Sequence, residues 1–230
     1  MKKDKIPKSI SKSVKNYIDK GIELYDQEDY NNAISNYNEA IRLDPTSAEV
    51  YYYRGNAKYN LKQYFEAISD YDEAIRLDPN DAKTYCNRGL TKIRLKHPKD
   101  AISDLDEAIR LNPEFIKAYY NRAIAKCEIE QYFGSISDLD MVIRLDPNDD
   151  QAFEHRGFDK SKLGHYEAAI SDYDEAIRLN PENTDAYINR GVAKKKLGLD
   201  AEADEDFQKV ISLVEAWENE ELIAEIKKQM

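Results

Sequence analysis

The sequence is poor in cysteine, tryptophan and glycine, and it contains no long hydrophobic run. With only two cysteines, Cys86 and Cys127, in 230 residues, the chain has no framework of several disulfide bonds. No stretch approaches the roughly 18 consecutive apolar residues that a membrane-spanning helix needs. The basic start is not followed by the apolar run of a secretory signal. These absences favour a soluble cytoplasmic protein that does not act on a membrane.

Positive charge is also in short supply. The 34 basic residues are outnumbered by 45 acidic ones, which gives a net charge of −11. A strongly acidic protein repels a polyphosphate chain, so the composition argues against nucleic acid as a partner. Hydrophobic residues nevertheless make up 41% of the chain, which argues against disorder throughout.

The sequence also lacks the residue patterns of catalysis and metal binding. His97, His155 and His165 share no metal-ligand spacing. A phosphate-binding glycine loop and a nucleophile elbow are both missing. The many carboxylates are expected on solvated helix faces, where no tuning of pKa is expected. We therefore predict that the protein is not an enzyme and has no catalytic residue, no cofactor and no metal ion.

A repeat of 34 residues dominates what is present. Copies of the segment AIRLDP, or close variants, end at Pro45, Pro79, Pro113, Pro147 and Pro181, and a degraded copy ends at Glu215. A period of this length indicates stacked helical hairpins. Each copy has two segments with helical spacing of apolar residues, separated by a short turn. The Asp-Pro or Asn-Pro pair ends the second helix, because proline cannot continue the backbone ladder.

The repeat divides the chain into three regions. We expect a basic N-terminal extension at 1–13, six repeats over 14–215, and a helix at 216–230 that caps the open end of the stack. The six repeats span approximately 14–47, 48–81, 82–115, 116–149, 150–183 and 184–217. The alternative for the last helix is that it binds a partner.

Small and large residues recur in register. The first helices carry Gly21, Gly55, Gly89, Ala123, Gly157 and Gly191 at one position. A glycine inside a helix costs about 1 kcal/mol relative to alanine, so its repeated use implies that two helices approach closely there. We expect the space between hairpins to be filled by Tyr37, Tyr71, Leu105, Leu139, Tyr173 and Phe207.

On these residues the chain resembles the tetratricopeptide repeat (TPR) family over residues 14–215. The resemblance implies an all-α fold, a right-handed superhelical solenoid of antiparallel helix pairs whose first helices line a concave groove. It also implies a non-catalytic scaffold or adaptor that binds a peptide or helix of a partner protein in that groove.

The family pattern places one set of residues in the groove. This set is Tyr52, Asn56, Tyr59, Asn87, Leu90, Ile93, Arg94, Lys117, Tyr120, Asn121, Ile124 and Phe158. Many of its members are apolar or aromatic, and an exposed apolar patch of this kind is typical of an interaction site. The alternative is that some of these side chains pack between neighbouring hairpins.

Charge is divided between the two kinds of helix. The first helices of the third and sixth repeats are rich in lysine and arginine, so we expect the groove to be neutral to basic at its middle and C-terminal end. The acidic runs of the second helices are expected to be solvated. One arginine per repeat, from the second repeat on, is expected to pair with an aspartate of the stack rather than with a ligand; the arginines are Arg54, Arg88, Arg122, Arg156 and Arg190.

Two other functions compete with the adaptor. One is a structural TPR module that self-associates. The other is a binder of an acidic C-terminal peptide, like the co-chaperones of the family. The family's carboxylate clamp is matched by Asn56, Asn87 and Lys117, but Tyr52 and Asn121 stand where lysine and arginine are expected. A carboxylate would therefore lose most of its charge-assisted contacts.

Overall fold

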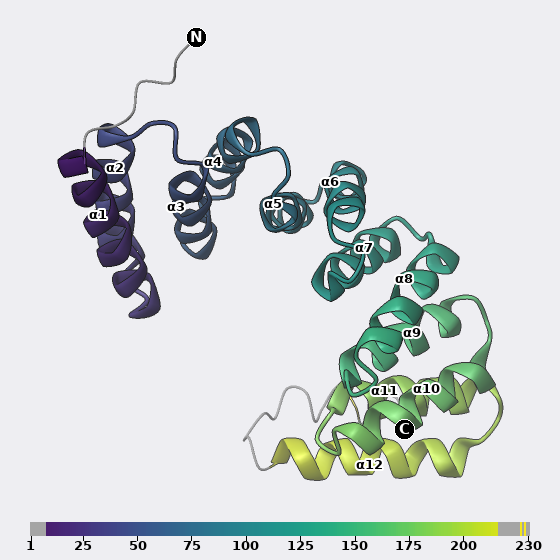
Figure 1. Cartoon of the computed structure of the whole chain (residues 1–230). Helices are drawn as coiled ribbons and strands as arrows, with labels where there is room; N and C mark the ends of the chain where they lie inside the picture. Colours follow the sequence, from purple (N-terminus) through teal and green to yellow (C-terminus); the bar gives the residue numbers. More distant parts are fainter. Residues whose placement is uncertain (1–7, 216–225, 227, 229–230) are drawn as a thin grey trace. The chain divides into compact units, whose positions relative to one another are not determined.

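The structure is a computed structural model of the chain, and it describes residues 8–215 together with residues 226 and 228. This part of the chain contains twelve α-helices and no strand (Figure 1). The helices are α1 (Lys8–Asp26), α2 (Tyr30–Leu43), α3 (Ala48–Asn60), α4 (Tyr64–Leu77), α5 (Ala82–Arg94), α6 (Pro98–Leu111), α7 (Ile116–Glu128), α8 (Tyr132–Leu145), α9 (Asp150–Lys162), α10 (Tyr166–Leu179), α11 (Thr184–Lys196) and α12 (Asp200–Glu215).

The helices belong to two compact units. Unit 1 covers residues 1–121 and unit 2 covers residues 122–230, so the division falls within α7. In unit 1, each helix from α1 to α5 packs against the helix that follows it. In unit 2, each helix from α8 to α11 does the same. Packing between successive hairpins in this way makes the fold an all-α solenoid.

The predicted regions at the two ends of the chain compare differently with the structure. Helix α1 begins at Lys8, inside the segment predicted as an extension. The helix predicted at 216–230 lies outside the described residues, apart from Ile226 and Lys228. Ile226 is 2% exposed and packs in a cluster with Tyr187 and Phe207 of unit 2.

The turn inside each hairpin has the same backbone conformation six times. One residue per turn has a positive φ, between 60° and 79°, and the six are Glu28, Lys62, Lys96, Glu130, Gly164 and Gly198. A residue in this left-handed region ends a helix by turning the next amides back toward its last carbonyls. The amide of Asp29, for example, donates to the carbonyl of Leu24 at 2.9 Å.

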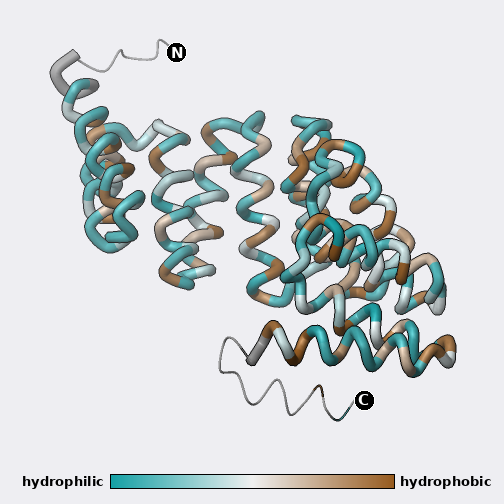
Figure 2. The backbone as a smooth tube through the Cα atoms, turned by 90° about the horizontal axis from the view of Figure 1, so that it is seen from below, coloured by the Kyte–Doolittle hydropathy of each residue, from teal (hydrophilic) through white to brown (hydrophobic). Residues whose placement is uncertain are grey.

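The core of each hairpin pairs a small residue with a large one. Tyr37, Tyr71, Leu105, Leu139, Tyr173 and Phe207 are all at most 1% exposed. A Cβ atom added to Gly55 would lie 2.7 Å from the Tyr71 ring, and one on Gly89 would lie 2.9 Å from Leu105 Cγ. The predicted close approach is therefore confirmed. Figure 2 shows hydrophobic residues recurring at intervals along the helices rather than in one long run.

One arginine in each repeat from the second on is held by aspartates of the stack. Arg88 donates from Nε and Nη2 to the carboxylate of Asp104, at 2.9 and 2.6 Å, and from Nη1 to Asp72 of the preceding hairpin. Lys92 adds a 2.8 Å ion pair to Asp104. The same arginine–aspartate–lysine arrangement recurs around Asp70, Asp138, Asp172 and Asp206.

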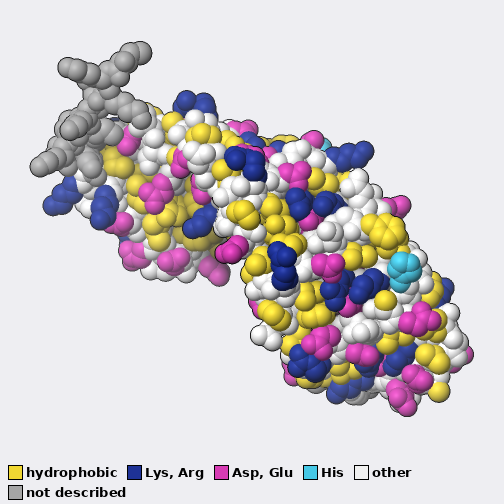
Figure 3. All heavy atoms as spheres, turned by 45° about the vertical axis from the view of Figure 1, so that its right-hand side comes forward, with side chains coloured by type: hydrophobic (Ala, Val, Ile, Leu, Met, Phe, Trp, Pro, Cys, Tyr) yellow, Lys and Arg dark blue, Asp and Glu magenta, His cyan; other side chains and the backbone are white. Residues whose placement is uncertain are grey.

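The arginines therefore serve the stack, as predicted. The expectation that the acidic runs are solvated is wrong for Asp70, Asp104, Asp138, Asp172 and Asp206, which are only 3–5% exposed. The remaining charges are spread widely. Figure 3 shows acidic and basic side chains interspersed over the face in view.

Candidate functional site

The first helices of unit 1 line a cavity of about 450 Å³. Its lining consists of Tyr25, Tyr52, Asn56, Tyr59, Asn60, Tyr71, Lys83, Asn87, Leu90, Phe115 and Lys117. Half of the predicted groove set lies here: Tyr52, Asn56, Tyr59, Asn87, Leu90 and Lys117. The volume falls in the range of ordinary ligand-binding clefts. We refer to it as the tyrosine cavity.

A hydrogen-bond network fixes the polar side chains of the tyrosine cavity. The Oδ1 atom of Asn56 accepts from Tyr71 Oη at 2.8 Å and from Asn87 Nδ2 at 2.9 Å. Asn87 Nδ2 also lies 3.3 Å from Tyr52 Oη. Because both lone pairs of Asn56 Oδ1 are used, its Nδ2 group remains as an oriented donor.

Charge in the tyrosine cavity is positive. Lys83 and Lys117 lie in the lining, and none of the described residues that line the cavity carries a carboxylate. Burial raises the pKa of the Tyr25 and Tyr71 phenols, so both hydroxyls are neutral at physiological pH. The cavity therefore offers aromatic rings, amide donors and two ammonium groups to a ligand.

Hydrogen bonds between successive first helices recur at a spacing of 35 residues. The pairs are Asn60 with Tyr25, Asn87 with Tyr52, Arg94 with Tyr59, Asn121 with Cys86 and Asn189 with Glu154. This regularity was not predicted. It means that several polar residues of the first helices also join neighbouring hairpins.

The structure places Ile93 and Asn121 differently from the prediction. Both are 5% exposed, so neither presents its side chain to an open groove. Ile93 lies on the buried stripe of α5, four residues after Gly89. Asn121 Nδ2 donates to the sulfur of Cys86 at 3.6 Å. Two other predicted groove residues lie in unit 1. Arg94 donates to the hydroxyl of Tyr59. Tyr120 is not part of the lining of the tyrosine cavity or of the cavity in unit 2 that is introduced next.

Unit 2 contains a second cavity, of about 330 Å³. We call it the acidic cavity. Its lining consists of Ile124, Cys127, Glu128, Glu154, His155, Phe158, Asp185 and Asn189. The predicted groove residues Ile124 and Phe158 lie in it, and three carboxylates accompany them.

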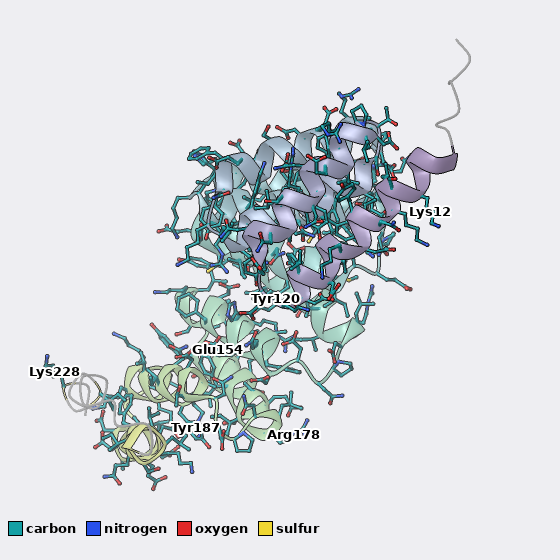
Figure 4. The ribbon with its side chains drawn as sticks, turned by 90° about the vertical axis from the view of Figure 1, so that its left-hand side faces the viewer. Lys12, Tyr120, Glu154, Arg178, Tyr187 and Lys228 are labelled. Atoms are coloured by element: carbon teal, nitrogen blue, oxygen red, sulfur yellow. The ribbon has the colours of Figure 1, made fainter. Side chains whose placement is uncertain are left out.

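Glu154 is the most perturbed of these carboxylates. Desolvation by burial raises its pKa to about 7, and the charges of Asp185, Asp159 and Asp150 act in the same direction. The hydrogen bond from Asn189 Nδ2, at 2.7 Å, opposes this shift. Figure 4 shows Glu154 among the helices of unit 2.

The neighbours of Glu154 do not neutralise it. His155 Nε2 lies 3.5 Å from Glu154 Oε2. Burial lowers the pKa of His155, so this imidazole is neutral at physiological pH and the contact is not an ion pair. Burial and the nearby Asp159 raise the pKa of the Cys127 thiol to about 12, so Cys127 carries no charge either.

The expectation of a basic groove at the C-terminal end is wrong for Arg190, Lys194 and Lys195, three of the four cations that suggested it. Arg190 and Lys194 bind Asp206 at 2.5 and 2.9 Å, inside the sixth hairpin. Lys195 lies 3.5 Å from Asp204. The cations of this segment therefore neutralise acids of the stack, and the lining of the cavity in unit 2 is acidic.

Sequence reasoning missed Glu154 and Asp159, although the repeat contained a signal for both. Glu154 occupies the position held in the other repeats by Ile18, Tyr52, Cys86, Tyr120 and Ile188. Asp159 occupies the position of Glu23, Ala57, Thr91, Ala125 and Ala193. An acid that departs from its own repeat pattern is not required by the stack.

In the part of the chain that the structure describes, no group of three or more His, Cys, Asp or Glu side chains could hold a metal ion. Within that part, too, each helix is too short or too polar to cross a membrane.

Models of two tetratricopeptide repeat types match most of the chain. The model described as TPR repeat matches residues 21–62, 55–95 and 161–198, and the one described as tetratricopeptide repeat matches 82–115 and 184–214. The chain belongs to the tetratricopeptide repeat family. Repeats of this family typically form non-enzymatic scaffolds for protein interaction.

Solved structures of TPR proteins resemble the chain. A crystal structure of MamA protein is 27% identical, with a TM-score of 0.68 over 73% of this chain and 92% of that one. YrrB, described as a TPR protein with an unusual peptide-binding site, is 23% identical, with a TM-score of 0.67 over 77% of this chain and 95% of that one. PilF of Pseudomonas aeruginosa is 17% identical, with a TM-score of 0.80 over 96% of this chain and 100% of that one. The last two share the fold alone. No curated protein matches the chain.

Proposed function

We propose that this TPR protein is a non-catalytic scaffold that binds an extended or helical segment of a partner protein in the tyrosine cavity. The observation that carries the proposal is the lining itself: tyrosine rings and Leu90 provide apolar contact area beside oriented amide donors. Tyrosine is favoured at the centres of protein interfaces because it combines a large apolar ring with a hydrogen-bonding group.

The polar groups suggest how such a segment would be oriented. Asn56 Nδ2 is held in place by the two hydrogen bonds to its Oδ1, so it can donate to a main-chain carbonyl without first being ordered. Lys83 and Lys117 supply positive charge beside it. The structure thus supports a partner segment that is apolar on one side and carries carbonyl or carboxylate oxygens on the other.

A single substitution tests the site. We expect Leu90→Glu to abolish partner binding, because it replaces an apolar contact of the cavity lining with a charged, hydrated side chain. Phe65→Glu is the matched control, since Phe65 is 71% exposed and lies outside the cavity lining. Proteins captured from native lysate would be identified by mass spectrometry, with helicity of each variant checked by circular dichroism. A partner bound equally by wild type and by Leu90→Glu would contradict the proposal.

A second candidate is recognition of a partner's terminal carboxylate. It is favoured by Lys83, Lys117 and the Asn56 donor, which lie together in one carboxylate-free lining. The test compares an acidic C-terminal peptide with its amidated form by calorimetry. Tighter binding of the free acid would support this candidate, and equal binding would remove it. Self-association is checked separately by light scattering over a concentration series.

A further inference from the structure

We propose that the acidic cavity of unit 2 is a subsite for the side chain of a lysine or arginine supplied by a partner protein. This subsite is separate from the tyrosine cavity and takes a ligand of the opposite charge. It rests on the proposed scaffold function in one respect only, which is that a partner protein supplies the cationic side chain.

Five other buried acids of this chain are bound by cations. Asp70, Asp104, Asp138, Asp172 and Asp206 are buried, and each is bound by both an arginine and a lysine. Glu154 differs from them. Its side chain is only 12% exposed, yet it is bound by the neutral amide of Asn189 and contacts a histidine that is neutral at pH 7. A desolvated carboxylate without a cation is costly, and a cationic ligand would offset that cost.

A second buried acid, Asp159, lies next to Cys127, one of the residues that line the acidic cavity. Asp159 is 1% exposed, and within the described residues neither of its carboxylate oxygens has a hydrogen-bond partner. The neighbouring Ser135 hydroxyl donates instead to the carbonyl of Ala123, at 3.0 Å. Asp159 adjoins Cys127, which lines the cavity, and its charge raises the pKa of that thiol. Burial also raises the pKa of Asp159, so a second desolvated acid adjoins the lining of the acidic cavity.

The repeat shows that these acids are not needed for stacking. At the positions of Glu154 and Asp159, the other repeats carry uncharged residues with one exception, Glu23, whose side chain is exposed and paired with Lys20. A function that belongs to one repeat alone is the simplest reason for two acids that the solenoid does not require.

The shape and the walls suit a long cationic side chain. Ile124 and Phe158 provide apolar surface for an alkyl stem. The ring of Phe158 already accepts an ammonium group on its face, because Lys162 Nζ lies 4.8 Å from the ring centroid. Lys162 itself is exposed and is not part of the lining. A volume of about 330 Å³ is at the small end for ligand clefts and fits one side chain rather than a whole segment.

Binding should depend on pH. The charged or titratable groups around Glu154 are His155, Asp159, Asp150 and Lys162 on α9, Glu128 and Cys127 on α7, Asp185 on α11 and Tyr173 on α10. Since the pKa of Glu154 is about 7, lowering the pH from 8 to 6 neutralises it and removes its attraction for a cation. We expect the affinity for a cation to fall by about tenfold over this range.

The test adds small probe molecules to the full-length chain. Binding is monitored through the amide signals of Ile124 and Phe158 in ¹⁵N-resolved NMR. N-acetyl-lysine methylamide should shift these signals saturably at pH 8, and the uncharged N-acetyl-norleucine methylamide should not. The double variant Glu154→Gln/Asp185→Asn should weaken lysine binding at least tenfold. Glu167→Gln, an exposed change on α10, should leave it unaltered.

Two outcomes would overturn the proposal. One is an absence of saturable shifts with the lysine probe, and the other is an equal response to norleucine; both are read on the wild type, so neither depends on a variant's folding. The Leu90→Glu variant separates this subsite from the tyrosine cavity. It should keep full binding of the lysine probe even if the proposed function of the tyrosine cavity fails.

Discussion

Single residues in this chain act through pairs that recur with the repeat. Arg88 and Asp104 make a bidentate ion pair in which the aspartate is 5% exposed. Arg110 and Glu107 also make a bidentate ion pair, but Arg110 is 64% exposed. The two pairs have the same chemistry in different surroundings, which makes them a test of what burial contributes.

We expect Arg88→Ala to lower the free energy of unfolding by about 2–3 kcal/mol, because it leaves the buried Asp104 with Lys92 alone. Arg110→Ala should change it by less than about 0.5 kcal/mol, since exposed ion pairs contribute little. Urea unfolding followed by circular dichroism measures both. Equal effects of the two substitutions would show that burial of the pair is not what matters.

At the scale of the helix, glycine has two different roles. Gly89 lies in α5 where an added Cβ would come within 2.9 Å of Leu105 Cγ and 3.3 Å of the carbonyl oxygen of Ala101. Gly134 lies near the start of α8, where the nearest atom would be Lys126 Cδ at 3.2 Å. A backbone carbonyl and a buried leucine cannot give way, whereas a flexible lysine side chain can.

Gly89→Ala should therefore destabilise the protein by about 1–3 kcal/mol through overpacking. Gly134→Ala should be neutral or stabilise it by up to about 1 kcal/mol, because alanine has the higher helix propensity. Thermal unfolding of both variants beside the wild type provides the comparison. A Gly89→Ala variant as stable as the wild type would mean that the helices need not approach so closely.

The molecule as a whole is acidic, and folding strongly raises the pKa of one of its acids, Glu154. The pKa of Glu154 is raised from 4.5 to about 7 by folding. Between these values the folded state keeps a proton that the unfolded state has lost. Stability from this group is thus present at low pH and is lost as the pH rises toward 7.

We expect Glu154→Gln to remove this dependence, since glutamine can still accept the hydrogen bond from Asn189 and does not titrate. Relative to the wild type, the variant should gain on the order of 2–3 kcal/mol of stability between pH 5 and pH 8. Urea midpoints at the two pH values measure the gain, with Glu167→Gln as the exposed control. A difference between variant and wild type that is the same at both pH values would refute the assignment.

The sequence alone determined the repeat, the helical hairpins and the residues of their core. These follow from local chemistry: the Asp-Pro or Asn-Pro pair ends the second helix of a hairpin, and small and large residues in register already specify one close contact per hairpin. The arginine–aspartate pairs were predictable for the same reason, because they recur in every repeat from the second on.

Only the tertiary structure decided which side chains of the first helices face a cavity. Ile93 and Leu90 are three residues apart and both apolar, yet one is buried and the other lines the tyrosine cavity. The sequence also left the charge of the groove undecided, because Arg190, Lys194 and Lys195 of α11 are paired with acids of α12. Burial and ion pairing depend on the neighbouring helices. A chain's own sequence does not show which of its charges those neighbours have already neutralised, and for that reason the acidic cavity appeared only in three dimensions.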